Sequence, residues 1–274
     1  MTNKSRSLWL GCWVGAANLL VSGLASAQVA TDAASTAGTE ASRRSNVRDE
    51  LPLAAYAYAA RGVSPRKAGA QGFALGLMAA DQRTTLGGGA MVWGAPLKRL
   101  TLIGDAQRNI YGNFSPSAAV IGHLLGDRRH GWSLGALGKF KIDGFASGPH
   151  KDGVESELEL GALISLAESG FNLDINLIAG RGLGDDGETD TETRLRFGRE
   201  LGRLVWLGLD GQGRQRVSGP RTLPNGRSWD FAGGPQLLVG SGSFFAVLTA
   251  GPATIGLLST NIGFTSMLGI GGTT

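Results

Sequence analysis

Residues 154–181 read VESELELGALISLAESGFNLDINLIAGR, and this stretch decides the fold. In its first half an apolar or small residue occupies every second position from Val154 to Leu166, with glutamates between the first of them. In its second half the alternation runs from Phe171 to Ala179, with Asn and Asp between the apolar residues. Successive side chains of a β-strand point to opposite faces, so the pattern predicts two strands, each with one apolar and one polar face.

The same alternation recurs along the chain from about residue 70. It predicts about twelve strands, at 72–80, 89–95, 99–109, 117–125, 131–143, 154–166, 170–181, 189–201, 203–216, 228–240, 243–251 and 255–268. The connections between them alternate in length. The longer ones are 81–88, 110–116, 144–153, 182–188 and 217–227. The shorter ones are 96–98, 126–130, 167–169, 202 and 241–242. One exception is predicted, near Gly251–Thr254, where a short connection stands in place of a long one.

The composition favours a β protein. The chain has 274 residues, of which 45 are Gly, roughly twice the average usage. Interior Gly costs a helix about 1 kcal/mol per position, whereas a large curved sheet uses it at bends and close approaches.

Residues 1–27 have the organisation of a secretory signal peptide. Two basic residues, Lys4 and Arg6, precede an apolar run that ends in the small residues Ala25–Ala27. The run is short and Gly-interrupted for a membrane anchor, which is the alternative. Its removal would lower the formal net charge from +4 to +2, too small a bias to predict a nucleic-acid partner. It would also remove Cys12, the only cysteine, so neither a disulfide nor a thiolate metal site is expected.

Together these features resemble the transmembrane β-barrel proteins of Gram-negative outer membranes. The resemblance covers residues 70–274 and rests on architecture, not on a family-specific motif. It implies an all-β, antiparallel up-and-down transmembrane barrel that is exported, inserted by the barrel-assembly machinery, surrounded by outer-membrane lipids and monomeric. Trp132, Trp206 and Trp229 fit the aromatic girdles of such barrels. The chain departs from the family pattern at Gly271–Thr274, where an aromatic residue is usual.

Residues 28–69 are predicted to form a flexible periplasmic segment, because their first half is rich in Ala, Ser and Thr and has no apolar period. Within it, acidic residues at the start and Arg61 at the end favour a short helix over 49–61. A strand at 53–59 is the alternative. The segment 49–61 either enters the barrel as a plug or stays in the periplasm.

If the apolar face contacts lipid, the polar face lines the lumen. The predicted lumen-lining residues, with a structural or a pore role, are Lys139, Lys141, Glu155, Glu157, Glu159, Asp174, Asn176, Glu192, Arg194, Arg196, Asp210 and Arg214. The same face carries Asp105, Gln107, Asp143, Glu200, Gln212, Arg216, Asp230 and Gln236. A soluble barrel would reverse the two faces, and alternation alone does not distinguish the arrangements. The signal peptide and the connection lengths favour the membrane arrangement.

Closing the connections symmetrically sets opposite charges across neighbouring strands, where each pair stabilises by a few tenths to about 1 kcal/mol. The predicted partners are Lys139 and Lys141 with Glu155, Glu157 or Glu159, Asp174 with Arg196, Asn176 with Arg194, and Arg194 with Asp210. We therefore predict an internal salt-bridge network, which either fills a narrow barrel or lines a polar pore.

No motif for catalysis or cofactor binding occurs. His130 and His150 lie in connections without metal-ligand spacing, so no metal site and no cofactor are expected. A lipid-acting enzyme would need a histidine at the membrane rim with a serine beside it. His123 and Ser133 come nearest to this pattern, but no catalytic residue is assigned. The acidic cluster in 185–192 is interpreted as a solvated loop rather than as a calcium site.

The sequence therefore predicts a passive small-solute pore or a structural membrane protein, with a charged, salt-bridged lumen. Twelve strands lie between filled eight-stranded barrels and open sixteen-stranded porins, so strand number leaves both roles open. The alternatives are an outer-membrane lipid-acting enzyme and a secreted soluble β-barrel.

Overall fold

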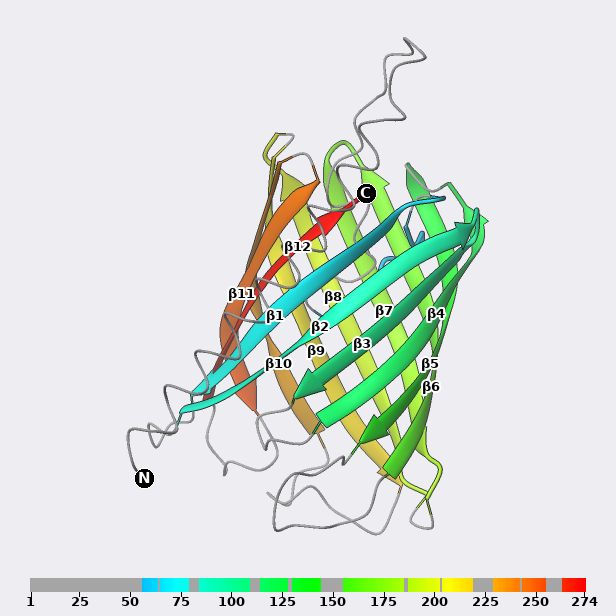
Figure 1. Cartoon of the computed structure of the whole chain (residues 1–274), viewed down its shortest axis with the longest axis vertical. Helices are drawn as coiled ribbons and strands as arrows, with labels where there is room; N and C mark the ends of the chain where they lie inside the picture. Colours follow the sequence, from blue (N-terminus) through cyan, green and yellow to red (C-terminus); the bar gives the residue numbers. More distant parts are fainter. Residues whose placement is uncertain are drawn as a thin grey trace. The chain divides into compact units, whose positions relative to one another are not determined.

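The computed structural model describes residues 56–63, 65–78, 84–108, 114–127, 130–143, 155–184, 187–202, 204–218, 229–241, 243–254 and 263–274. Twelve antiparallel strands in these residues form a closed barrel (Figure 1). The strands are β1 (Ala68–Met78), β2 (Thr84–Leu97), β3 (Leu100–Arg108), β4 (Phe114–Gly126), β5 (Gly131–Asp143), β6 (Glu155–Glu168), β7 (Phe171–Gly182), β8 (Thr189–Glu200), β9 (Val205–Ser218), β10 (Trp229–Ser241), β11 (Phe244–Thr254) and β12 (Gly263–Thr273). Each strand pairs with its neighbours in sequence, and β1 pairs with β12 to close the barrel.

The predicted fold class and strand number are confirmed, with strand ends shifted by a few residues. The largest shift is at the last strand, predicted at 255–268 and found at Gly263–Thr273. Residues 255–262 therefore form the preceding connection, and long and short connections alternate without the predicted exception. The glycine-rich chain end still forms a strand. Gly271 leaves room there for the ring of Phe245, since a Cβ on Gly271 would lie 2.5 Å from that ring.

The apolar face of the strands points outward. Leu160, Leu177 and Phe197 are 59%, 52% and 47% exposed, whereas Asp174 and Arg196 on the opposite face are 0% and 2% exposed. This distribution contradicts the soluble alternative, in which the apolar face would be packed inside. An apolar exterior around a polar interior is the arrangement of a transmembrane barrel.

Apolar side chains also fill the lumen nearer the short turns. They include Trp93, Ile121, Leu137, Leu163, Phe245 and Val247. Trp206 belongs to the same cluster, so its prediction as a girdle residue is wrong. It shares the inward face of β9 with Asp210, and its indole ring occupies the space left by Gly198 and Gly208. Trp132 and Trp229 are exposed at the ends of their strands, as the girdle prediction requires.

Residues 56–63, here called the lumen segment, run inside the barrel. Ala57, Tyr58, Ala60 and Val63 are completely or almost completely buried. The predicted helix is not formed over 56–61, because backbone N–H groups here bind side chains of the barrel wall instead of helical carbonyls. The earlier part of that prediction, 49–55, lies outside the described residues. Among the described residues no helix is long and apolar enough to cross a membrane.

Candidate pore lumen

A row of polar side chains, here called the polar belt, crosses six neighbouring strands from β6 to β11. Its members are Ser165, Asp174, Arg196, Asp210, Gln236 and Thr249. The first four lie directly opposite one another on successive strands, and the last two form another such pair. All six are at most 2% exposed. Strand register therefore places these groups in a continuous row along the inner wall.

Neighbouring members of the polar belt pair with one another. Arg196 Nη2 lies 2.7 Å from Asp174 Oδ2, and Arg196 Nε donates to the same oxygen at 2.9 Å. The Ser165 hydroxyl donates to Asp174 Oδ1 at 2.5 Å. The Gln236 amide donates to Asp210 Oδ2 at 2.8 Å. A buried ion pair is tolerated only when such additional hydrogen bonds serve the remaining lone pairs.

The polar belt holds the lumen segment through its backbone. The N–H groups of Tyr56 and Ala57 donate to the two carboxylate oxygens of Asp210 at 3.0 and 3.3 Å. The N–H of Ala60 donates to the Ser165 hydroxyl oxygen at 2.9 Å. Asp210 therefore receives three donors, two from the lumen segment and one from the belt.

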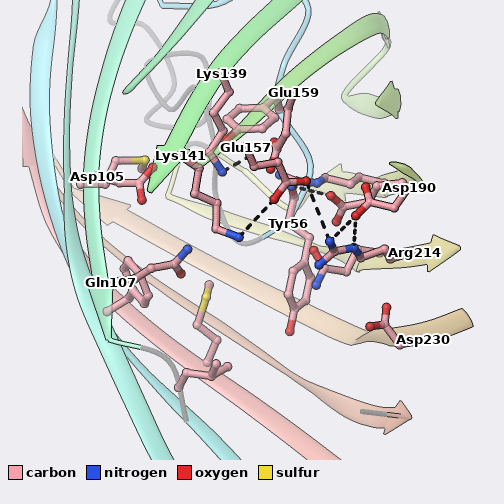
Figure 2. A pocket seen from close by; sticks show the side chains of 18 of the residues that line it. Tyr56, Asp105, Gln107, Lys139, Lys141, Glu157, Glu159, Asp190, Arg214 and Asp230 are labelled. Atoms are coloured by element: carbon pink, nitrogen blue, oxygen red, sulfur yellow. Dashed lines mark hydrogen bonds and ion pairs between the residues drawn. The ribbon is translucent and has the colours of Figure 1, made fainter. Parts of the chain in front are cut away.

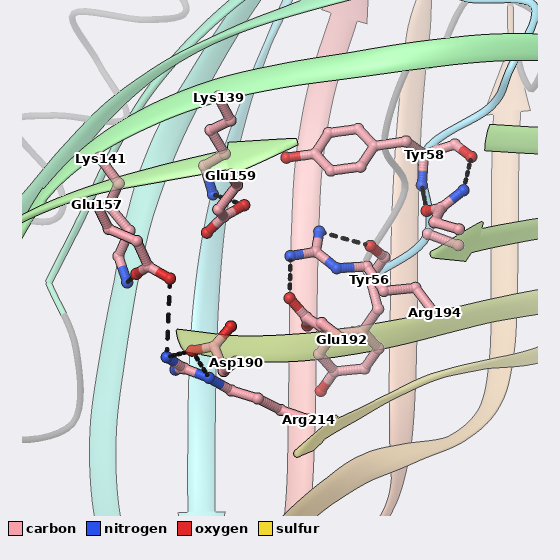
Figure 3. A network of polar contacts seen from close by, with 12 residues as sticks. Tyr56, Tyr58, Lys139, Lys141, Glu157, Glu159, Asp190, Glu192, Arg194 and Arg214 are labelled. Atoms are coloured by element: carbon pink, nitrogen blue, oxygen red, sulfur yellow. Dashed lines mark hydrogen bonds and ion pairs between the residues drawn. The ribbon is translucent and has the colours of Figure 1, made fainter. Parts of the chain in front are cut away.

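Tyr58 is held on both sides of its backbone by one side chain. Its N–H donates to Asn176 Oδ1 at 2.7 Å, and Asn176 Nδ2 donates to its carbonyl at 2.9 Å. Arg194 donates to the Tyr56 carbonyl at 3.1 Å, and its guanidinium lies 5.1 Å from the centre of the Tyr58 ring (Figure 3). A cation over a tyrosine face is attracted by the ring quadrupole, which adds to the hydrogen bond.

Two contacts fix the other end of the lumen segment. The Val63 N–H donates to Thr101 Oγ1 of β3 at 2.9 Å. The Ala60 carbonyl lies against Gly135 of β5, where a Cβ would be 2.6 Å from the carbonyl oxygen. The segment thus spans the lumen from β9 to β3, and glycine is required at the point where it touches β5.

On the long-connection side of the lumen segment lies a cavity of about 300 Å³, here called the vestibule (Figure 2). Tyr56 and Tyr58 contribute to its lining. Charged groups from β5, β6, β8 and β9 line one part of the wall: Lys139, Lys141, Glu157, Glu159, Asp190, Glu192, Arg194 and Arg214. Apolar groups from β1, β2 and β12 line another part: Phe73, Leu75, Met91 and Met267.

Each cation of the vestibule pairs with an acid on the same or a neighbouring strand, and Arg214 of β9 also reaches Glu157 of β6 (Figure 3). The pairs are Lys139 with Glu159 at 3.7 Å, Lys141 with Glu157 at 3.6 Å, Arg194 with Glu192 at 2.8 Å, and Arg214 with Asp190 and, at 3.9 Å, with Glu157. The wall of the vestibule is therefore densely charged but largely neutralised locally.

The cross-strand register predicted from the sequence is confirmed in two of three strand pairs. The confirmed partners are Lys139 with Glu159, Lys141 with Glu157, Asp174 with Arg196, and Asn176 with Arg194. The third prediction is wrong, because Asp210 lies opposite Arg196 and Arg194 lies opposite Gln212. The β8–β9 connection spans 201–204 instead of turning at Gly202 alone, and this difference shifts the register by two residues.

The structure distributes the predicted lumen-lining residues over three locations. The polar belt contains Asp174, Arg196 and Asp210. The lumen segment is bound by Asn176 and Arg194. The vestibule is lined by Lys139, Lys141, Glu157, Glu159, Glu192, Arg194 and Arg214. Glu155 begins β6 opposite Asp143, and both of their side chains lie outside the described part.

The acidic cluster interpreted as a solvated loop is partly inside the barrel. Asp190 lies in β8, lines the vestibule and pairs with Arg214. Glu188 Oε2 lies 2.8 Å from Arg216 Nη2. Asp185 and Asp186 fall outside the described residues. In the described part of the chain, no group of three or more His, Cys, Asp or Glu side chains is arranged to hold a metal ion.

The histidine and serine considered for lipid chemistry both face the lumen. His123 and Ser133 are 6% and 3% exposed and lie on the inward faces of β4 and β5. A lipid hydrolase needs its nucleophile and base where a lipid can reach them. Their positions give no support to that alternative.

No protein-family model and no curated protein sequence matches the chain. Solved structures with the same fold include the NanC porin, with a TM-score of 0.56 and 9% identity over 73% of this chain and 98% of that chain. An outer membrane channel from Pseudomonas putida F1 has a TM-score of 0.53 and 10% identity over 82% and 100% of the two chains. The KdgM porin, solved in complex with oligogalacturonate, has a TM-score of 0.51 and 5% identity over 74% and 98%.

The chain therefore has the architecture of Gram-negative outer-membrane β-barrels, as the sequence resemblance predicts. Within that class its fold is that of porins and channels. At these identities the likeness concerns the fold, and the solute that each of those proteins carries says nothing about this lumen.

Proposed function

We propose that the protein is an outer-membrane channel for small polar solutes whose lumen is constricted by the lumen segment. The observation that carries the proposal is the vestibule, a polar cavity inside a closed barrel that ends on a segment bound through its backbone to the wall. The apolar exterior and the porin-like fold support insertion of a monomer in the outer membrane, after export by the signal peptide and assembly by the barrel-assembly machinery.

The proposed channel is closed in the conformation described. Five backbone N–H groups of the lumen segment donate to side chains of the wall, from Tyr56, Ala57, Tyr58, Ala60 and Val63. A net contribution of about 1 kcal/mol for each such bond favours the bound position by several kcal/mol. An open form with the segment displaced is then a minor population, and conduction consists of rare openings.

The contact at Gly135 provides the test. A Gly135→Ala variant adds a Cβ that would lie 2.6 Å from the Ala60 carbonyl oxygen. The variant therefore weakens the binding of the lumen segment to the barrel wall without altering any charge. In planar bilayers we expect the unmodified protein to open rarely and Gly135→Ala to open at least tenfold more often. Tenfold corresponds to a loss of about 1.4 kcal/mol of closed-state stability.

A matched control exists in the same strand. Gly138 points outward, and a Cβ there makes only ordinary contact, 3.5 Å from Val120, so Gly138→Ala should behave as the unmodified protein. Both variants are first shown to be folded by the change in electrophoretic mobility on boiling. Folded protein without conductance in any of the three chains contradicts the channel and favours a purely structural barrel, for which the buried polar belt provides cross-strand bracing.

A further inference from the structure

Charges on the vestibule wall do not balance. Four cations and six acids line it, so the lining carries a formal net charge of −2. Every one of these cations has an acid partner within the wall. The two acids that remain are Asp105 and Asp230, and among the described residues neither lies within 4.0 Å of a cationic nitrogen. Figure 2 shows them on different parts of the wall, and Asp230 lies directly opposite Arg214 on the neighbouring strand.

A buried acceptor lies in the same row of the wall as Asp105. Gln71, Met91 and Asp105 are direct partners on β1, β2 and β3. Gln71 is 3% exposed, and its Oε1 accepts no hydrogen bond from the described residues. A buried acceptor without a donor costs about 1–3 kcal/mol, so a ligand that brings a donor to this oxygen recovers that cost.

The carboxylate at the other end of the row has one neutral partner. Asp105 accepts a hydrogen bond from the Ser117 hydroxyl of β4. Neighbouring strands are about 4.8 Å apart, so the backbones of Gln71 and Asp105 are separated by about 10 Å, with Met91 between them. Gln71, Met91 and Asp105 all line the vestibule, so a ligand in the cavity meets this row.

Apolar side chains continue the wall beside this row. Phe73 follows two positions after Gln71 on the same face of β1, and Leu75 lies directly opposite Met267 of β12. The vestibule, at about 300 Å³, is at the lower end of the range for small-molecule sites. The acceptor oxygens of Gln71 and Asp105 thus lie at one edge of an apolar surface. This arrangement suits a ligand with a cationic head and an apolar body.

We propose that the vestibule binds a primary ammonium carried on an apolar body, of the arylalkylamine class. The ammonium donates to Asp105 and to Gln71 Oε1, and the body packs on Phe73, Leu75 and Met267. Asp230 adds to the negative potential that favours cations over anions in the vestibule. This inference names a solute class for the proposed channel and rests on that proposal only for the route by which the ligand enters and leaves.

Calorimetric titration of the full-length protein, folded in detergent, tests the site with 2-phenylethylammonium as the probe. We expect the neutral 2-phenylethanol, of nearly the same shape, to bind at least tenfold more weakly. Asp105→Asn should weaken binding of the ammonium at least tenfold, and Gln71→Met severalfold. Neither substitution should change the affinity for the alcohol by more than about twofold.

Glu168→Gln supplies the control, because Glu168 is an exposed acid at the end of β6, far along the strand from the vestibule. Equal affinity for ammonium and alcohol, an unchanged affinity in Asp105→Asn, or no binding by protein that shows the boiling-dependent mobility shift would each overturn the inference. Binding without bilayer conductance keeps this site and contradicts the proposed channel. Conductance without binding keeps the proposed channel and contradicts this site.

Discussion

At the scale of single residues, the ion pair of Arg196 with Asp174 is the contact whose loss should cost most. Removing one partner leaves an uncompensated buried charge, which costs about 3–5 kcal/mol. Arg196 also lies opposite Asp210, so its loss removes the cation between two buried carboxylates. We expect Arg196→Met to lower the free energy of unfolding by about 3–5 kcal/mol, measured by tryptophan fluorescence in urea with protein in lipid vesicles.

Two further variants separate burial from charge. Arg199 lies on the exposed face of β8, 4.9 Å from the Phe171 ring centre, and Arg199→Met should cost at most about 1 kcal/mol. The double variant Arg196→Met with Asp174→Asn removes both charges and should be more stable than Arg196→Met alone. Equal losses in Arg196→Met and Arg199→Met would contradict the assignment of Arg196 to a buried pair.

Residue-scale prediction from the sequence was limited by register. Alternation assigns Lys139, Asp174 and Arg196 to one face of their strands, because parity within a strand is fixed. The partner of each residue also depends on connection length, and the unexpected length of 201–204 accounts for the wrong pairing of Arg194. The sequence could not predict that Gln71 Oε1 lacks a hydrogen-bond donor, because the surroundings of this oxygen depend on neighbours from two other strands.

At the scale of elements, the strands were predictable, whereas for the lumen segment the sequence offered entry into the barrel as one of two alternatives and did not predict the conformation. A lipid-facing strand shows local alternation of apolar and polar residues, and all twelve predicted ranges overlap the observed strands, although the last strand begins at Gly263 instead of 255. The lumen segment binds Asn176 and Asp210, 118 and 153–154 positions away, so nothing local encodes its conformation. Local charges favoured a helix there, and long-range hydrogen bonds overrode that preference.

The outward face of β6 permits a depth-dependent test of membrane insertion. Leu160 is 59% exposed near the middle of that strand, and an arginine at the bilayer midplane costs about 2–4 kcal/mol. Leu204 is 54% exposed in the short connection before β9, where the cost falls to about 0–1 kcal/mol. We expect Leu160→Arg to lower the free energy of unfolding in vesicles by about 2–4 kcal/mol, and Leu204→Arg to lower it by at most about 1 kcal/mol. Equal costs would mean that Leu160 does not face lipid.

At the scale of the whole molecule, closure joins the first and last strands of the barrel. β1 pairs with β12 along nearly its whole length, from Gly69 opposite Thr273 to Met78 opposite Phe264. No strand edge is then left unpaired in the described barrel, which satisfies the requirement that lipid imposes on backbone hydrogen bonding. The barrel closes only when its last strand has arrived, so every lumen contact argued above depends on complete assembly.

Closure with alternating connections also fixes which connections share a side of the membrane. Connections 144–154 and 219–228 are long and lie at the same end of the barrel, whereas the turn at 169–170 lies at the opposite end. Long loops of outer-membrane barrels face the exterior and short turns face the periplasm.

We expect an epitope inserted in 144–154 or 219–228 to bind antibody on intact cells, and one inserted at 169–170 to bind only after the outer membrane is permeabilised. Labelling of both ends only after permeabilisation would contradict insertion in the outer membrane, and labelling of 169–170 alone on intact cells would reverse the orientation. In the expected orientation the vestibule faces the exterior, so its ligand arrives from outside the cell and the lumen segment separates it from the periplasm.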